Sequence, residues 1–291
     1  AIGTAGDLAR AGQHQQAVDI VTSVLAHARS DADTSIALLA LRAESHAALG
    51  EMDHALADAE AMRARGERSG RSDLLARALI GLARVQILSG DIGASGKTAD
   101  LAVKASRKSR KKPIVVMALS CLAVAQMRLR KSADAVRNGT AAAHQFAALG
   151  DERERGRALW AVACAQDDLG RKLESERTAD AALALARRTG DRYGEAAALN
   201  IRWRQNIDLA MRLRGLQQAL AGYRASGYVS GQAAIYNNLA LAYRALGLYR
   251  HSNRMAHRAI EIRRRLNDFN GAANALIILG GMSVTVFRGA V

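Results

Sequence analysis

A leucine recurs every 40 residues through the first two thirds of the chain, at Leu39, Leu79, Leu119, Leu159 and Leu199. Four residues after the first four of these leucines there is an alanine, and eleven residues after most of them there is a glycine. A fixed period of this length is the signature of a repeat protein, whose units bury their apolar surface only by stacking on their neighbours. The period therefore predicts a stacked array rather than one central core.

The spacing within one unit is that of two amphipathic helices. Leu159, Val162 and Ala163 fall at i, i+3 and i+4, which places them on one face of a helix. Gly170 then suits the left-handed end of that helix. A second helix is expected from about Leu173 to Arg188, with small residues along one face that let the two helices approach closely. Each unit is predicted to be a helical hairpin.

The whole chain, 1–291, is predicted to be one solenoid domain. Its approximate units are 1–30, 36–70, 76–112, 116–150, 156–190, 196–228, 233–268 and a partial unit at 271–291. Arg130 replaces the turn glycine in one unit, and the unit at 196–228 is irregular. It has Arg202 and Trp203 where Leu and Ala are expected, and Ala210 at the glycine position. We expect a distortion or a shift of phase there.

This pattern resembles the tetratricopeptide repeat family, in its long-period bacterial form. The best match is the segment Tyr236–Tyr243, followed by small residues at the family positions, Gly247, Ser252, Ala256 and Ala259. The period of 40 exceeds the family's usual value of about 34, and the closing proline of the family pattern is absent. The resemblance implies an all-α, right-handed α-solenoid of stacked antiparallel helical hairpins, whose first helices line a concave groove that binds a protein or peptide.

Composition excludes several classes of protein. The chain is 49% apolar and 24% charged, and it has only two cysteines and one proline. It has no uncharged apolar run near the roughly 18 residues that a membrane-spanning helix needs, and two cysteines cannot form a disulfide framework. We therefore expect a cytoplasmic protein, and the bias toward alanine and arginine resembles that of GC-rich bacteria.

The motifs that resemble a phosphate-binding loop or a metal site lack the neighbouring residues and secondary structure that such sites require. The segment Gly90–Thr98 approaches a phosphate-binding loop, but Asp91 occupies the position of its first glycine and a helix precedes it instead of a strand. Cys121 and Cys164 lie far apart with no neighbouring ligands, which indicates packed thiols and no metal site. With no nucleophile–base pair either, we expect no enzyme activity and no cofactor.

Charge increases along the chain, with a net of −3 in residues 1–100, +8 in 101–200 and +10 in 201–291. The cationic side chains that we predict to form a basic surface are Lys108, Arg110, Lys111, Lys112, Arg250, Arg254 and Arg258. Such a surface favours an acidic partner. Nucleic acid is the weaker alternative, because the aromatic side chains that stack on single-stranded bases are missing from these clusters.

Projection of the repeat onto the concave side selects the residues one and five positions after each recurring large residue, with occasional contributions from the residue two positions after. The predicted groove residues are Arg84, Asn200, Arg204, Asn237, Asn238 and Arg244. Cys164 satisfies the same projection, and less strongly placed are Arg77, Met117, Arg157, Trp160 and Asn274. Asn238 matches the position at which peptide-binding members of the family contact the main chain of the peptide.

The leading functional hypothesis is a non-catalytic scaffold that binds an acidic protein or peptide in its groove. The alternative is a regulatory or sensor segment of a larger bacterial signalling protein, such as a nucleotide cyclase, a signalling ATPase or a transcription regulator. It is prompted by the missing initial Met and by an end within an eighth hairpin. The apolar segment Ala275–Leu279 also suggests end-to-end self-association.

Overall fold

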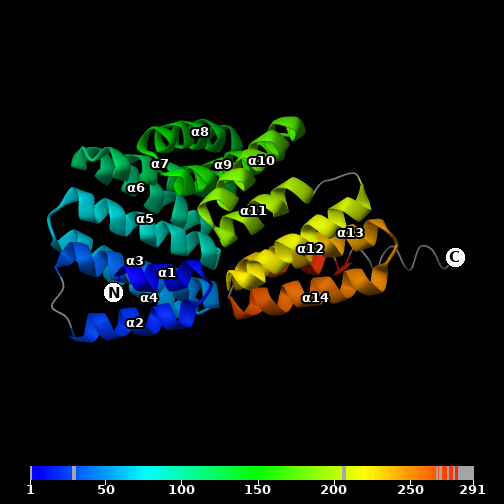
Figure 1. The fold of residues 1–291 in the computed structure, drawn as a ribbon, viewed down its shortest axis with the longest axis horizontal. Helices are drawn as coiled ribbons and strands as arrows, with labels where there is room; N and C mark the ends of the chain where they lie inside the picture. The colour runs from blue at the N-terminus through cyan, green and yellow to red at the C-terminus, as the bar shows by residue number, and fades with distance from the viewer. Residues whose placement is uncertain are drawn as a thin grey trace.

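A computed structural model describes residues 2–27, 31–204, 208–266, 268, 271–273, 275–277 and 279–280. These residues form fourteen named helices and no strand (Figure 1). The helices are α1 Ile2–Arg10, α2 His14–His27, α3 Ala32–Leu49, α4 Met52–Arg68, α5 Ser72–Ser89, α6 Ile92–Ser109, α7 Lys112–Arg128, α8 Ser132–Leu149, α9 Glu152–Asp168, α10 Lys172–Thr189, α11 Arg192–Trp203, α12 Leu209–Ala225, α13 Val229–Ala245 and α14 Tyr249–Arg265. The predicted all-α solenoid is confirmed.

Successive helices pack as antiparallel hairpins because small residues line the faces between them. The alanines that recur four residues after the periodic leucines, at Ala43, Ala83, Ala123 and Ala163, are at most 2% exposed. In two hairpins a serine of the second helix also donates a hydrogen bond to a carbonyl of the first. Ser175 Oγ lies 2.8 Å from the Ala163 oxygen, and Ser252 Oγ lies 2.7 Å from the Ala240 oxygen. A larger side chain at these positions would separate the helix axes.

Caps define both ends of many helices. Aspartates precede α3, α6, α9 and α11, and each accepts a hydrogen bond from the backbone N–H three residues later. Left-handed residues end α3, α5, α8 and α10, in each case a glycine. Arg110 and Arg130 have φ of 55° and 61°, so two arginines adopt a conformation that normally favours glycine. Arg130 is therefore a turn residue, as the repeat predicts.

The expected distortion of the unit at 196–228 is present. Helix α11 has 12 residues, whereas α9 has 17, and Asp208 caps the start of α12. Ala210 consequently lies inside α12 instead of at the turn where the repeat places it. Trp203 is bulkier than the usual alanine, and its ring fits only because Gly215 stands opposite: a Cβ on Gly215 would lie 2.2 Å from Trp203 Cγ.

The C-terminal helices return to contact the N-terminal hairpins. His14 Nε2 lies 2.9 Å from the Ser226 carbonyl oxygen, and at Gly12 a Cβ would lie 2.4 Å from the Ala225 oxygen. Leu266, at the end of α14, is buried among apolar residues of α3, α4 and α5. Figure 1 shows the ends of α12 and α14 beside the ends of the blue N-terminal helices. We call these contacts the closure; they join the two ends of the described array.

Candidate functional site

The first helices of neighbouring hairpins enclose a cavity of about 260 Å³ on the concave side. Its walls come mainly from α3, α5, α7 and α9, with Met62 of α4, Tyr193 of α11 and Tyr228 just before α13. The apolar part of the wall includes Ile80, Met117 and Trp160. A concave, largely apolar chamber with a few charged groups is the usual form of a binding site.

A cluster of partly buried ions lies at one side of the cavity. Glu154 accepts hydrogen bonds from Arg84 Nη2 at 2.9 Å and from Arg157 Nη1 at 3.1 Å. Arg157 also lies 3.6 Å from the carboxylates of Glu44 and Asp191. Burial alone would raise the pKa of Glu154, but Arg84 and Arg157 outweigh it and lower the pKa to about 2. The cluster is therefore ionised, and it connects α3, α5 and α9.

Tyr228 joins this cluster to the closure. Its hydroxyl donates a hydrogen bond to Glu44 Oε1 at 2.8 Å, and its ring lies 4.3 Å from that of Tyr193, centroid to centroid. Burial and the charge of Glu44 raise the pKa of Tyr228 well above its usual value, so the hydroxyl stays protonated and remains a donor. Tyr228 lies two residues after Ser226, and its ring lies 5.3 Å from that of His14, centroid to centroid, so it belongs to the closure and also forms one wall of the cavity.

Arg128 differs from the other arginines of the cavity wall in having no carboxylate partner among the described residues. Its guanidinium lies 5.9 Å from the centre of the Trp160 ring, in a cation–π contact. Its neighbours Arg77, Arg84 and Arg157 each pair with a carboxylate. Arg128 is exposed and forms no ion pair in the described part of the chain. It is therefore the cavity cation that is available to an anionic group of a ligand.

Cys121 lines the cavity, but its thiol is not activated as a nucleophile. Burial raises the pKa of the Cys121 thiol to about 11, and its sulfur lies 3.8 Å from the Ile80 carbonyl oxygen. Cys164 is also buried, and its pKa is likewise raised to about 11. A protonated thiol is a poor nucleophile, so neither cysteine is activated in the folded chain.

The predicted groove residues divide into two groups. Arg84 lines the cavity, together with the less strongly placed Arg77, Met117, Arg157 and Trp160. The remaining main candidates lie in or next to α11 and α13 and are not among the residues lining this cavity, namely Asn200, Arg204, Asn237, Asn238 and Arg244. Asn274 lies outside the described residues. The structure does not bring the two groups into one site.

Residues of the second group mostly have partners within the protein. Asn238 Nδ2 donates to Asn200 Oδ1 at 2.7 Å, and Arg204 Nε donates to Asp167 at 3.1 Å. Arg204 caps the shortened α11 instead of lying within a first helix, because that helix ends early. Asn237 Oδ1 is buried and accepts no hydrogen bond from the described residues, and Arg244 is half-buried in the last turn of α13.

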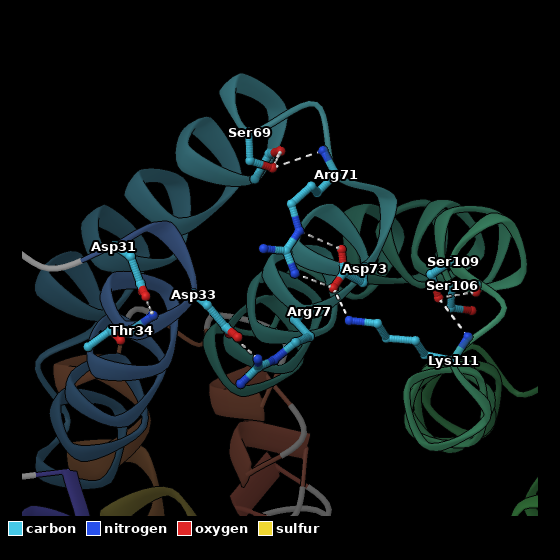
Figure 2. Close-up of polar contacts among 11 residues, drawn as sticks. Asp31, Asp33, Thr34, Ser69, Arg71, Asp73, Arg77, Ser106, Ser109 and Lys111 are labelled. Atoms are coloured by element: carbon cyan, nitrogen blue, oxygen red, sulfur yellow. Dashed lines mark hydrogen bonds and ion pairs between the residues drawn. The ribbon is translucent and has the colours of Figure 1, made fainter.

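The predicted basic surface consists of two separate clusters. Lys108, Arg110 and Lys112 are exposed around the α6–α7 connection, whereas Lys111 is paired. Figure 2 shows Lys111 directed at Asp73 on α5, where Arg71 also points. Hydrogen bonds from Arg71 and Lys111 hold the pKa of Asp73 far below its usual value.

The second basic cluster is an exposed stripe on α14, formed by Arg250, Arg254 and Arg258. Arg258 lies over the ring of Tyr236 at 5.8 Å and donates to its hydroxyl at 3.4 Å. The other two arginines form no ion pair with the described residues. This stripe is therefore an exposed cationic surface.

Several cavity residues were missed by the sequence interpretation. Glu44 lies five positions after Leu39 and so satisfies the same projection that selects Arg84. Arg128 lies four residues beyond Val124, on the same helix face, so extending the projection by one helical turn finds it. Tyr228 carries no comparable signal, because it enters the cavity only through the closure.

Known proteins match this chain in structure but not in sequence. No family model matches the sequence, and no curated protein matches it. A Rap protein complexed with Competence and Sporulation Factor superposes with a TM-score of 0.70 at 13% identity, covering 94% of this chain and 78% of that one. The apo form of RapI gives 0.63 at 12% identity, covering 86% and 90%.

A third solved structure, BtubC from P. vanneervenii, gives a TM-score of 0.52 at 19% identity, covering 74% of this chain and 92% of that one. At these identities the likeness concerns the fold, a TPR-like helical solenoid. In the described part of the chain, no helix combines the length and the apolar character needed to cross a membrane.

Proposed function

We propose that this chain is a non-catalytic scaffold that binds a segment of a protein or peptide in the concave cavity and holds an acidic group of that partner with Arg128. The observation that carries the proposal is the position of Arg128 beside an apolar chamber, stacked on Trp160 and without an ion pair in the described residues. A carboxylate from a partner would gain a charge-assisted hydrogen bond there. The apolar wall would bury a neighbouring side chain.

The size of the cavity supports a small occupant. A volume of about 260 Å³ is just below the range of roughly 300–1,000 Å³ typical of small-molecule pockets. It suits one or a few side chains of an extended segment rather than a folded domain. The fold itself is shared with a Rap protein complexed with Competence and Sporulation Factor, which is consistent with a solenoid that binds another molecule.

The proposal is tested by selecting peptides from a random displayed library on the wild-type chain and measuring their affinities by fluorescence anisotropy. The selected peptides are expected to pair an acidic residue with a large apolar one. Arg128→Gln should weaken their binding by about tenfold or more, since one charge-assisted hydrogen bond contributes roughly 1.5–3 kcal/mol.

Two variants complete the design. Arg177→Gln makes the same change of charge at an exposed position on α10, outside the cavity, and should leave binding unchanged. Ala37→Trp places a large ring at the cavity wall and should block binding. Equal affinity of the peptides for the wild type and for Arg128→Gln contradicts the assigned role of Arg128, and binding that survives Ala37→Trp contradicts the cavity as the site.

The basic stripe of α14, with the exposed lysines of the α6–α7 connection, is proposed to attract an acidic partner at long range. Exposed charges of this kind raise association rates and lose their effect in salt. Replacing Arg250 and Arg254 by Gln should slow peptide association at low salt while leaving dissociation unchanged. Retardation of DNA or RNA in a gel at low salt would instead indicate nucleic acid as the partner.

The second candidate function is a regulatory segment within a larger signalling protein. The observation that favours it is the likeness of the whole array to a Rap protein bound to a named factor. The neighbouring coding sequence tests this candidate, because an open reading frame confined to these 291 residues removes it.

A further inference from the structure

Two histidines and a glutamate meet at the turn between α3 and α4. His46 lies in the last turn of α3, Glu51 caps the start of α4, and His54 follows one helical turn later. His46 Nδ1 lies 2.6 Å from Glu51 Oε2, and His54 Nδ1 lies 3.9 Å from the same oxygen. One potential ligand atom from each residue lies within 4.8 Å of the other two. The two imidazole rings lie with their centroids 5.1 Å apart and their planes tilted by 47°.

We propose that this turn is a binding site for a zinc-class divalent ion, with His46, Glu51 and His54 as its three protein ligands. Imidazole nitrogens and a carboxylate oxygen are ligands that Zn²⁺ accepts, and two histidines with one glutamate leave a fourth position open to water. The cavity and its proposed peptide function are not involved in this site, since none of the three residues lines the cavity.

The distances allow an ion to be held after small rotations of the side chains. Bonds of about 2.0–2.2 Å in a tetrahedral arrangement separate two ligand atoms by about 3.3–3.6 Å. The contact of 2.6 Å between His46 and Glu51 must open by at most about an ångström, and the contact of 3.9 Å between His54 and Glu51 must shorten by less than that. His54 is free to move, because 73% of its side chain is exposed.

The backbone that carries these ligands is fixed before any ion binds. Gly50 adopts a left-handed conformation, with φ of 89°, and the Glu51 N–H donates to the His46 carbonyl oxygen at 2.8 Å. Behind the turn, the side chain of Leu266 covers Gly50, where a Cβ would lie 3.1 Å from Leu266 Cδ2. A rigid support of this kind lowers the ordering cost of ligand binding.

The His/Glu grouping has a competing explanation, an interaction between the histidines and the glutamate with no metal ion bound. The prediction of no metal site rests on the spacing of the two cysteines, and none of the three ligands proposed here is a cysteine. The two explanations differ in a direct measurement, since that interaction alone does not bind zinc at a defined stoichiometry.

The test is a zinc titration of the untagged chain by isothermal calorimetry, followed by cobalt substitution and visible absorption spectroscopy. One equivalent of zinc is expected, together with a rise in the midpoint of thermal unfolding. Co²⁺ should give the d–d absorption of a low-coordinate site with nitrogen and oxygen ligands. His54→Gln should weaken zinc binding at least tenfold, because loss of even an outer-shell partner commonly costs 10–100-fold in affinity.

His144→Gln is the matched control, since His144 is exposed on α8 and far from the turn in sequence. Its zinc affinity and thermal shift should equal those of the wild type. His46→Gln and Glu51→Gln should both reduce the affinity, with folding checked by circular dichroism. The proposal is overturned if no variant at these three positions changes zinc binding, or if the wild-type chain binds no zinc.

Discussion

The hydroxyl of Tyr228 donates a hydrogen bond to Glu44 at 2.8 Å, although 184 residues separate the two in the sequence. Glu44 also faces Arg157 of α9 at 3.6 Å. A single carboxylate therefore connects the closure of the array with the ions of the cavity. Burial alone would raise the pKa of Glu44, but the charges of Arg157 and Arg84 and the hydrogen bond from Tyr228 lower it overall.

Removing this hydroxyl should loosen the closure. Tyr228→Phe leaves the ring contact with Tyr193 in place but deprives a charged acceptor of its donor. We expect a loss of about 1.5–3 kcal/mol in the free energy of unfolding, measured by urea denaturation. Tyr249→Phe, at an exposed position on α14, should change stability by less than about 0.5 kcal/mol. Equal stabilities of the two variants would contradict the role of Tyr228.

Glu154 should contribute to the acid sensitivity of the fold. Its pKa falls from an ordinary value of 4.5 to about 2 on folding. A lowered folded-state pKa means that the stabilisation is complete above pH 4.5 and is lost as the pH falls toward 2. Unfolding free energies of the wild type should therefore decline over that interval. Glu154→Gln should lose less stability over this interval. At pH 7 it should be less stable than the wild type by about 1–3 kcal/mol, since Arg84 loses its carboxylate partner while Arg157 keeps Glu44 and Asp191.

Arg110 should be replaceable with a gain in stability. It adopts φ of 55° at the end of α6, where a side chain costs about 1–2 kcal/mol relative to glycine. Arg110→Gly should raise the midpoint of thermal unfolding by a few degrees. Lys104→Gly, in the exposed middle of the same helix, should lower the midpoint because glycine costs about 1 kcal/mol there. A lower midpoint for both variants would show that the left-handed conformation is not strained.

Both thiols should be unreactive until the chain unfolds. Cys121 and Cys164 are buried, and burial raises both pKa values to about 11, so almost no thiolate exists at pH 8. Ellman's reagent is expected to react slowly with the native protein and with both thiols in concentrated urea. Fast reaction of one equivalent in the native state would show that one first helix opens readily.

The periodic part of the fold could be predicted from the sequence because its causes are local. A helix expected from about Leu173 to Arg188 corresponds to α10, Lys172–Thr189. The substitution of Trp203 for a small residue predicts the irregularity that shortens α11. In each case the prediction comes from the size of the side chain at a fixed position of the helix. The size of that side chain also determines how closely two helices approach each other.

The site could be predicted only in part, because it depends on contacts between distant segments. Arg84 is placed in the cavity by the repeat alone, and its partner Glu154 lies 70 residues later. Nothing in the spacing indicates that Tyr228 returns to Glu44, since that contact requires the rotations of all intervening hairpins to accumulate correctly. Asn200 and Asn238, on the first helices of two neighbouring hairpins, pair with each other and do not line the cavity.

The contact of Leu266 with α3, α4 and α5 also limits how this protein could change by duplication. An open array tolerates the gain or loss of one unit, because every unit contacts only its immediate neighbours. Here an extra hairpin between α4 and α12 would move Leu266 and Tyr228 away from the residues of the N-terminal helices that they contact. The number of units is thus set by the geometry of the molecule, and evolutionary variation should fall on loops and exposed faces instead.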